Sequence, residues 1–411
     1  MADLLNFLKD AILNGERKAE TYAKPVKRDL YDQLVQKPRM HVLYGMRGSG
    51  KTTLLFQRFM DYPKSKRIYL NGDEVGILSL SLSELFNNLK YVIDEKGSAV
   101  FLDEVTRISG WSEQLKVVYD NYPELEVYVS GSSAVELAES KTQLARRAKY
   151  HVILPMTFRE FIKIAYGIEL RKYELNAKDI YTESIKYDIY FKGIIKKNPR
   201  ELVQEYSEKS QPFMLEADED MLMDLMDKVI YGDIAKAYPF QKDVLNNMHR
   251  MLLIFSMSEK TTYDNLSKDL KLSKGVIGEM IRALSNSGII KAVLPYGSGR
   301  IAGRKTWRYF FTVPAVRRMY MKKGGAEQSR IAGLIREDLF VSQLENVFYL
   351  PDGPDFVYNG KVFEVGGASK GTGQLDNINL KIPKFIVYDG TDMEREKDVL
   401  KIPFYMFLSH L

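Results

Sequence analysis

The 411-residue chain contains no cysteine, which excludes disulfide bridges, thiolate metal sites and cysteine nucleophiles. It has four histidines, at positions 41, 151, 249 and 410, so a histidine-based metal site is not expected. No apolar run approaches the ~18 residues that a helix needs to cross a bilayer. The first twenty residues carry acidic side chains early and offer no small-residue cleavage site, so they do not read as a signal peptide. We therefore expect a cytoplasmic protein without a membrane partner.

The positive charge of the chain is small overall but concentrated in one segment. The formal net charge is +6, whereas residues 255–323 alone contain 14 Lys/Arg against 4 Asp/Glu. The remainder of the chain is therefore slightly acidic. A basic excess confined to one segment indicates a local anionic partner.

Short apolar runs alternate with helical patterns in the first 165 residues. The helical runs cover residues 1–35, 52–60 and 80–94, and the apolar strand-like runs cover residues 40–44, 67–70, 99–103 and 127–130. Strands that alternate with helices favour a parallel sheet covered on both faces. We therefore expect an α/β domain here, followed by a helical, charge-rich stretch from about residue 158 to residue 251.

A glycine-rich turn lies between the first strand and the following helix. Residues 45–52 read Gly-Met-Arg-Gly-Ser-Gly-Lys-Thr, which fits the P-loop pattern Gly-x4-Gly-Lys-Ser/Thr. Glycines let successive backbone N–H groups converge on phosphate oxygens, and the helix start adds its positive dipole end. We expect Lys51 to reach the β- and γ-phosphates of ATP and the Thr52 hydroxyl to bind Mg²⁺. The expected nucleotide contacts are Gly45, Arg47, Gly48, Ser49, Gly50, Lys51, Thr52 and Thr53.

Acidic and hydroxyl side chains end two further strands. Asp103 and Glu104 follow four apolar residues at the carboxyl end of a strand, where ligands of parallel sheets bind. Asp103 would hold Mg²⁺ through water, and Glu104 would activate the attacking water. Ser130, at the end of the next strand, could sense the γ-phosphate or simply cap the strand. Arg146 and Arg147 could supply an arginine finger, in cis or from a neighbouring subunit, or form a solvated basic pair.

Together these residues resemble a family of predicted AAA+-superfamily ATPases from bacteria and archaea. In that family a P-loop precedes a strand ending Asp-Glu, a Trp, a Ser/Thr-Gly-Ser-Ser strand end, an arginine-bearing helix and a Pro-Leu-Ser-Phe-Arg-Glu-like element. The matching parts here are residues 45–52, 103–104, 111, 130–133, 146–147 and 155–161. The resemblance covers about residues 28–165 and continues more weakly beyond. It implies an AAA+-type ATPase domain and a C-terminal region that looks like a winged helix followed by a restriction-endonuclease-like fold.

The basic segment has the pattern of a helix-turn-helix with a wing. Residues 261–270 and 274–286 read as two short helices joined by a turn, with Ser273 as the second helix's N-cap. Two strands, at residues 289–294 and 306–312, flank a basic loop. We expect a winged helix that binds DNA mainly through contacts to the DNA phosphate backbone. The alternatives are a winged helix that contacts another protein or serves as a rigid spacer. The expected nucleic-acid contacts are Lys274, Arg282, Arg300, Arg304, Lys305 and Arg308.

The last segment retains part of a nuclease pattern. Asp355 and Glu364 have suitable spacing for a metal site, and Glu337 on the preceding helix could be a third acid. The position of the usual lysine is Gly366, and Lys370 would have to reach back from a glycine-rich stretch. We therefore expect a non-cleaving relic or a binding module here, with an active nuclease as the alternative.

The predicted organisation has four parts. They are an ATPase domain at 1–165, a helical lid or linker at 166–250, a winged helix at 251–323 and a degenerate restriction-endonuclease-like domain at 324–411. The first functional hypothesis is an Mg²⁺-dependent ATPase switch coupled to DNA. The rival hypotheses are a signalling or assembly ATPase with a protein client, and an ATP-regulated nuclease. An arginine finger in trans would require a homo-oligomer.

Overall fold

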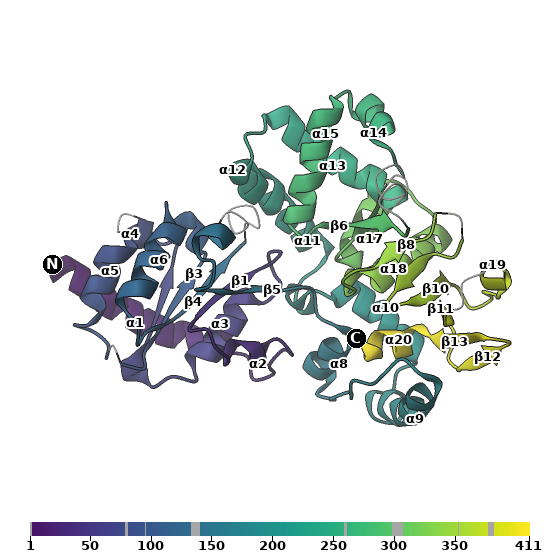
Figure 1. The fold of residues 1–411 in the computed structure, drawn as a ribbon, viewed down its shortest axis with the longest axis horizontal. Coiled ribbons are helices and arrows are strands. Elements are labelled where there is room, and N and C mark those ends of the chain that lie inside the picture. The colour runs from purple at the N-terminus through teal and green to yellow at the C-terminus, as the bar shows by residue number, and fades with distance from the viewer. Residues whose placement is uncertain are drawn as a thin grey trace. The chain divides into compact units, whose positions relative to one another are not determined.

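The computed structural model describes residues 2–78, 81–94, 96–132, 140–258, 261–297, 307–351, 353–376 and 382–411. The chain forms two compact units (Figure 1). Unit 1 comprises Met1–Leu154 together with Gly232–Tyr238, and unit 2 comprises Pro155–Tyr231 together with Pro239–Leu411. The chain therefore leaves unit 1 after Leu154, returns to it for seven residues, and leaves it again. Among the described residues, every helix is too short or too polar to cross a membrane.

Unit 1 is an α/β fold built on a parallel sheet. Its five strands lie in the order β2-β3-β4-β1-β5, and every neighbouring pair is parallel. The strands are β1 (Met40–Tyr44), β2 (Arg67–Asn71), β3 (Ala99–Asp103), β4 (Glu126–Gly131) and β5 (Lys149–Val152). The four strands expected from the apolar runs are confirmed. The edge strand β5 is an addition that the sequence did not indicate.

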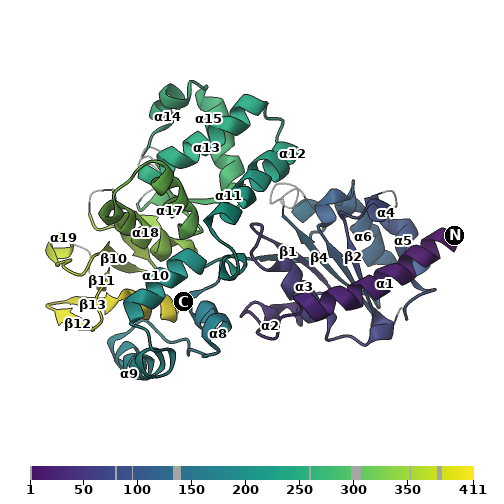
Figure 2. The same cartoon turned by 180° about the vertical axis from the view of Figure 1, so that it is seen from behind.

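Helices cover both faces of this sheet because successive strand residues point to opposite sides. Leu102 and Val127 belong to the core under α5 and α6, whereas Phe101 and Tyr128 belong to the core under α3. Figure 2 shows α1 running along the near side of unit 1. The helices are α1 (Ala2–Tyr22), α2 (Tyr31–Leu34), α3 (Lys51–Phe59), α4 (Val75–Leu78), α5 (Leu82–Leu89), α6 (Trp111–Asn121) and α12 (Ala235–Ala237), with short 3-10 turns η1 (Lys64–Lys66) and η2 (Val105–Arg107).

The expectation of one continuous helical stretch over residues 1–35 is wrong. Helix α1 ends at Tyr22, and α2 is a single turn at Tyr31–Leu34. Pro25 lies in the gap, and proline cannot donate the backbone hydrogen bond that a helix interior requires. The helical pattern over residues 80–94 is likewise shorter in the structure, where α5 ends at Leu89.

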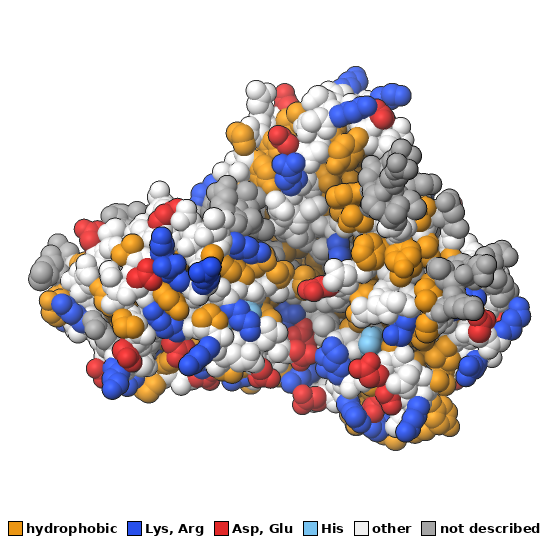
Figure 3. Space-filling model, viewed as in Figure 1, with side chains coloured by type: hydrophobic (Ala, Val, Ile, Leu, Met, Phe, Trp, Pro, Cys, Tyr) orange, Lys and Arg blue, Asp and Glu red, His pale blue; other side chains and the backbone are white. Residues whose placement is uncertain are grey.

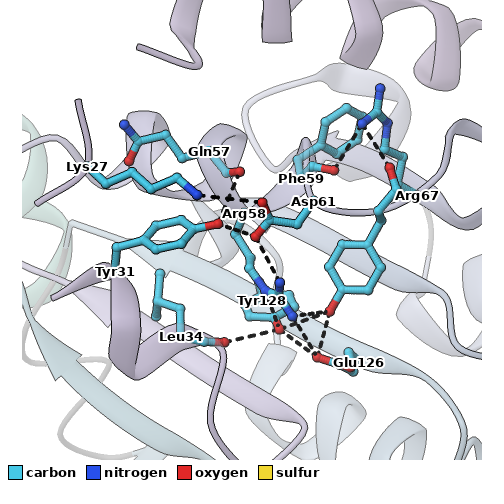
Figure 4. Close-up of polar contacts among 11 residues, drawn as sticks. Lys27, Tyr31, Leu34, Gln57, Arg58, Phe59, Asp61, Arg67, Glu126 and Tyr128 are labelled. Atoms are coloured by element: carbon cyan, nitrogen blue, oxygen red, sulfur yellow. Dashed lines mark hydrogen bonds and ion pairs between the residues drawn. The ribbon is translucent and has the colours of Figure 1, made fainter. Parts of the chain in front are cut away.

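Helix α3, which begins at the phosphate loop, is fixed to the sheet at its other end. The Arg58 guanidinium donates to the hydroxyl groups of Tyr128, at 2.9 Å, and Tyr62, at 2.8 Å. Both hydroxyls donate in turn to one oxygen of Glu126, at 2.6 and 2.7 Å. Figure 4 shows Arg58 pointing into this group of side chains from α3 and β4. The network fixes the C-terminal end of α3 to β4.

Unit 2 combines helices with a mixed sheet. Its eight strands lie in the order β12-β13-β11-β10-β9-β8-β6-β7, and β10, β11 and β13 are mutually parallel. The strands are β6 (Ile290–Pro295), β7 (Arg308–Phe311), β8 (Phe348–Tyr349), β9 (Phe356–Tyr358), β10 (Lys361–Gly366), β11 (Lys384–Tyr388), β12 (Glu394–Glu396) and β13 (Val399–Pro403). Because β6 pairs with β8, the basic segment and the last segment share one sheet.

The helices of unit 2 confirm the helical character expected after residue 158. They are α8 (Phe158–Tyr166), α9 (Ala177–Asp188), α10 (Pro199–Lys209), α11 (Glu219–Asp227), α13 (Lys242–Met257), α14 (Tyr263–Leu270), α15 (Lys274–Asn286), α17 (Pro314–Lys323), α18 (Gln328–Ser342), α19 (Gly373–Asp376) and α20 (Phe404–His410), with η3 (Ile189–Ile195), η4 (Pro212–Leu215) and η5 (Lys228–Ile234) between them. Helices α14 and α15 match the two predicted short helices. The Ser273 hydroxyl accepts a hydrogen bond from the backbone N–H of Val276, so the expected N-cap is confirmed.

A buried ion pair joins α17 to α18. Arg317 and Asp338 are both fully buried, and two guanidinium nitrogens donate to the two carboxylate oxygens at 2.5 and 2.9 Å. The same guanidinium donates to the backbone carbonyls of Phe255 and Ser256, each at 3.0 Å, at the end of α13. Asp338 also accepts from the backbone N–H of Phe311 at 2.9 Å. The pair thus fixes three elements of the basic segment to α18.

Candidate functional site

The glycine-rich loop between β1 and α3 forms a tight turn at the carboxyl end of β1. Gly50 has φ +92° and caps α3, a backbone conformation that favours glycine. A Cβ at Gly45 would lie 2.4 Å from the carbonyl oxygen of Ile153, so only glycine fits there. Arg28 donates from Nη1 to the carbonyls of Ser49, at 3.0 Å, and Leu154, at 2.9 Å, which fastens the loop to the chain beyond β5. No motif in the sequence indicated a role for this arginine.

Lys51 lies almost wholly buried at the start of α3. Its Nζ donates to the carbonyl oxygens of Gly45, at 2.9 Å, and Met46, at 3.2 Å. Burial lowers the pKa of Lys51, while the nearby carboxylates of Glu104 and Asp103 act to raise it. In the same loop the buried Ser49 hydroxyl has no hydrogen-bond partner among the described residues. An ammonium group and a spare hydroxyl donor beside a helix N-terminus suit the oxygens of a phosphate chain.

Asp103 accepts hydrogen bonds from three neighbouring hydroxyl groups. Thr52 donates to its Oδ2 at 2.8 Å, Tyr69 donates to the same oxygen at 2.8 Å, and Ser130 donates to Oδ1. Burial raises the pKa of Tyr69, and the charge of Asp103 raises it further, so Tyr69 remains a donor. The Thr52 hydroxyl and the Asp103 carboxylate are hard oxygen donors of the kind that Mg²⁺ prefers. These two residues therefore fit the expected metal position.

Glu104 is the next residue and is held in an unusual conformation. Its φ of +51° is left-handed, and its backbone N–H donates to the Ser130 hydroxyl at 3.3 Å. The Ser132 hydroxyl donates to its Oε1 at 2.9 Å. Gly72, at the end of β2, approaches so closely that a Cβ there would lie 2.4 Å from the Glu104 carbonyl oxygen. The Ser132 hydroxyl just after β4 thus holds the carboxylate that the sequence assigns to water activation, while the end of β2 packs against the Glu104 backbone.

Arg47, in the middle of the loop, is bound by a residue that is distant in sequence. Its Nε and Nη2 donate to the two carboxylate oxygens of Asp233 at 2.7 and 2.8 Å. The hydrogen bond with Asp233, opposed by burial, raises the pKa of Arg47. Three residues further along, Lys236 donates to the carbonyl of Thr106, at 2.8 Å, just after Glu104. The returning segment Gly232–Tyr238 therefore contacts both the phosphate loop and the turn after β3, which no motif in the sequence indicated.

The two candidate finger arginines differ in their surroundings. Arg147 forms an ion pair with Asp120 of α6 at 2.9 Å. Arg146 is exposed and has a left-handed φ of +67°. The structure thus brings Lys51, Thr52, Asp103, Glu104 and Ser130 together, while Arg147 is held on the surface of α6. Thr53 follows in the first turn of α3 and is half-buried.

The candidate nucleic-acid residues are spread over several environments. Lys274 forms an ion pair with Asp264 of α14, and Arg282 is exposed on α15. Arg308 is buried, with its guanidinium 4.6 Å from the centre of the Tyr349 ring, so it does not lie on the surface. Arg300, Arg304 and Lys305 lie outside the described residues. Figure 3 shows Lys and Arg side chains gathered over α14.

Two acids of the last segment lie close together, Glu364 buried and Asp355 half-buried. Asp355 Oδ2 accepts from the backbone N–H of Val365 at 2.9 Å, and Glu364 accepts from the backbone N–H of Asp355 at 3.3 Å. Lys370 does reach back and forms an ion pair with Glu364, and its side chain covers Gly366. Burial and the Asp355 charge raise the pKa of Glu364 to about 7, against the effect of Lys370. Within the described ranges, Glu337 does not complete a group of three acids able to hold a metal.

Comparison with known proteins agrees with the geometry of unit 1. Residues 37–162 match the family model of an AAA domain. The chain is 28% identical to the uncharacterized protein MJ1637 of Methanocaldococcus jannaschii, over 98% of this chain and 94% of that protein. A second protein of that organism, the uncharacterized protein MJ1544, is 29% identical over 46% of this chain and 41% of its own length.

Among solved structures, the chain is similar to the Walker-type ATPase PABY2304 of Pyrococcus abyssi. The TM-score is 0.43 at 14% identity, over 72% of this chain and 95% of that one. The domain match supports an AAA-type P-loop ATPase in unit 1, and such domains bind nucleotide, usually with Mg²⁺.

Proposed function

We propose that the chain binds and hydrolyses ATP with Mg²⁺ at the loop of residues 45–52. The observation that carries the proposal is the 2.8 Å contact between the Thr52 hydroxyl and the Asp103 carboxylate, directly beside the phosphate loop. Separate elements, α3 and β3, deliver these two oxygen ligands to one point. A structural turn would have no reason to bring a strand-end carboxylate to the first helical threonine.

Different residues of the site bind the phosphates, hold the metal ion and activate the attacking water. The backbone N–H groups of the loop and Lys51 bind the phosphates, and Thr52 and Asp103 hold the metal position. Bound Mg²⁺ would neutralise charge on the phosphate oxygens. Glu104, oriented by Ser132, takes a proton from the attacking water, and Ser130 fixes the Asp103 carboxylate that lies beside it. Arg146 is the exposed candidate for an arginine finger, which would act on a neighbouring subunit.

The proposal also assigns a coupling role to the segment Gly232–Tyr238. Both of its ends are covalently joined to unit 2, while Asp233 and Lys236 bind the phosphate loop and the turn after Glu104. Arg47 can satisfy its guanidinium either with Asp233 or with phosphate oxygens, because both are bidentate acceptors. A nucleotide that draws Arg47 away from Asp233 would loosen this segment. The effect of nucleotide binding would in this way be transmitted to unit 2.

The ATPase proposal is tested by Mg²⁺-dependent phosphate release from ATP. The wild-type chain should turn over, and Lys51→Ala should not, while its circular dichroism stays unchanged. Lys64→Ala is the matched control, because that lysine is exposed and lies in the same unit. Normal turnover in Lys51→Ala would reject the site.

We further propose that the basic segment is a winged helix that binds duplex DNA. The proposal is supported by the two-helix arrangement of α14 and α15, the antiparallel pair β6-β7 and the concentration of Lys and Arg over residues 255–323. Binding should weaken steeply with salt, since each neutralised phosphate releases counterions. Fluorescence anisotropy with a labelled duplex tests this, and Lys274→Ala together with Arg282→Ala should weaken binding. No binding at low salt would favour the protein-client alternative.

The ion pair between Lys370 and Glu364 keeps a nuclease as a second candidate for the last segment. Lys370 places an ammonium group beside Glu364, although the usual lysine position of the nuclease pattern is occupied by Gly366. Incubation of plasmid DNA with Mg²⁺ or Mn²⁺ tests this candidate. Cleavage that Glu364→Ala abolishes would support it, and intact DNA with both metals would reject it.

A further inference from the structure

A cavity of about 490 Å³ lies in unit 2 at the carboxyl ends of three parallel strands. Gly367, Asp389 and Phe404, which directly follow β10, β11 and β13, all line it. Ligands of open parallel sheets bind at this edge, because the loops after the strands diverge there. We propose that the cavity is a binding site for a small organic anion with a phosphate or carboxylate head and an apolar body. The cavity belongs to unit 2, whereas the phosphate loop belongs to unit 1, and its proposed role does not depend on the proposed ATPase activity.

Positive charge predominates in the lining. Three arginines, Arg200, Arg318 and Arg336, face a single acidic lining residue, Asp389. The Nη1 of Arg336 donates to Asp389 Oδ2 at 2.6 Å, which orients its guanidinium at the cavity wall. Guanidinium groups bind carboxylate and phosphate oxygens in a bidentate manner. The lining is therefore suited to an anionic head group.

The guanidinium of Arg318 makes fewer hydrogen bonds within the protein than it has donors. Its Nη2 donates to the buried Ser207 hydroxyl at 3.1 Å, and its Nη1 lies 3.5 Å from a Glu208 oxygen. Its Nε is buried and has no hydrogen-bond partner among the described residues. Because this Nε has no exposed surface, a ligand in the cavity would meet Arg318 as one of the positive charges of the lining.

The remaining wall is apolar and determines the class of ligand. Val203 of α10, Ile335 and Leu339 of α18, and Phe404 of α20 are buried side chains of this wall. The volume lies within the usual range for small-molecule sites, about 300–1,000 Å³. A bare inorganic ion would leave most of this surface uncovered. The ligand therefore combines the anionic head with a body the size of a nucleoside or a medium-length acyl chain.

Calorimetric titration of the full chain at low ionic strength tests the site with three probes. They are adenosine monophosphate, octanoate and inorganic phosphate. At least one organic probe should bind, and it should bind more tightly than inorganic phosphate. Competition between the two organic probes shows which head group and body the cavity prefers.

Four variants assign the binding to the cavity. Arg336→Ala should weaken it about tenfold or more, as expected for the loss of a charge-assisted hydrogen bond. Ala332→Trp, at an exposed lining position, should block it while keeping every charge. Arg330→Ala, on the same helix but outside the lining, and Lys51→Ala should both bind like wild type.

Four results would overturn the proposal. The first three are no binding of either organic probe, inorganic phosphate binding as tightly as the organic probes, and binding that persists in both Arg336→Ala and Ala332→Trp. Binding lost in Lys51→Ala would assign the probe to the phosphate loop and would equally overturn it. Failure of ATP hydrolysis with intact probe binding would leave the cavity proposal standing.

Discussion

Arg47 of the phosphate loop and Asp233, 186 positions later in the chain, form a two-point ion pair with distances of 2.7 and 2.8 Å. The side chains are mostly buried, with exposed fractions of 24% and 13%. Asp233 also contributes to the electrostatic surroundings of Lys51. In the proposed function, this carboxylate lies beside two cations that bind phosphate and competes with the charge of a nucleotide. The pair therefore joins the proposed nucleotide site directly to the segment that returns from unit 2.

Replacing Asp233 with asparagine should tighten ATP binding. The change removes the competing charge and frees Arg47 for phosphate oxygens. An ion pair of about 1 kcal/mol corresponds to roughly fivefold in affinity. Titration with a fluorescent ATP analogue measures the effect. Asp120→Asn is the control, because it breaks the Arg147 ion pair on the surface of the same unit. Unchanged or weaker binding in Asp233→Asn would argue against the competition.

Replacing Arg317 with methionine should destabilise unit 2 strongly. The change removes the Arg317 guanidinium from the buried Asp338 carboxylate, which costs about 3–5 kcal/mol. The chain has two tryptophans, and Trp307 lies in unit 2 while Trp111 lies in unit 1. In a Trp111→Phe background, urea unfolding followed by Trp307 fluorescence therefore reports on unit 2 alone.

The double change Arg317→Met with Asp338→Leu is the control for this prediction. It should recover part of the lost stability because no charge stays buried. Recovery should be incomplete, since the carbonyls of Phe255 and Ser256 and the N–H of Phe311 lose their partners. A single variant as stable as wild type would contradict the role given to the pair.

The stability of unit 1 should fall as the pH drops from about 6.5 to about 4. His41 Nδ1 and His151 Nε2 lie 2.9 Å apart between β1 and β5, and burial lowers the pKa of each ring to about 4. Above pH 6.5 both rings are neutral in the folded and unfolded chain, so they add no pH dependence. Below pH 6.5, the two histidines bind protons in the unfolded chain but stay neutral in the folded chain. The free energy of unfolding therefore falls by up to about 3 kcal/mol per ring.

The measurement is unfolding followed by Trp111 fluorescence in a Trp307→Phe background. His41→Phe should flatten the dependence, because one of the two titrating rings is gone. His249→Gln, in unit 2, is the control and should leave the slope unchanged. An identical slope in wild type and His41→Phe would contradict the assignment to this pair.

The strands that carry the site could be predicted because their signals are local. Four apolar residues before Asp103 and a fixed glycine spacing before Lys51 specify a strand and a phosphate loop without reference to the rest of the chain. Strand β5 was missed because only His151 is buried among its four residues, so the run carries no apolar pattern. Its pairing with β1 is decided by tertiary contact.

The long-range parts of the site were beyond sequence reasoning. Nothing in the local sequence around Asp233 distinguishes it from other helix-surface acids, and its partner is set by how the chain returns to unit 1. The same holds for Arg28 and Gly72, whose roles depend on backbone that the fold brings close to them. For Arg308 the prediction failed in another way. Its place beside a basic loop suggested an exposed nucleic-acid contact, but the side chain lies buried against Tyr349.

We propose that Glu104 drives hydrolysis at a site formed by Lys51, Thr52 and Asp103. The most direct measurement compares ATP binding and phosphate release in wild type and Glu104→Gln. The variant should bind ATP with wild-type affinity and release phosphate at least about 100 times more slowly, since general-base catalysis contributes about that much. Phosphate release at the wild-type rate in Glu104→Gln, with binding intact, would contradict it.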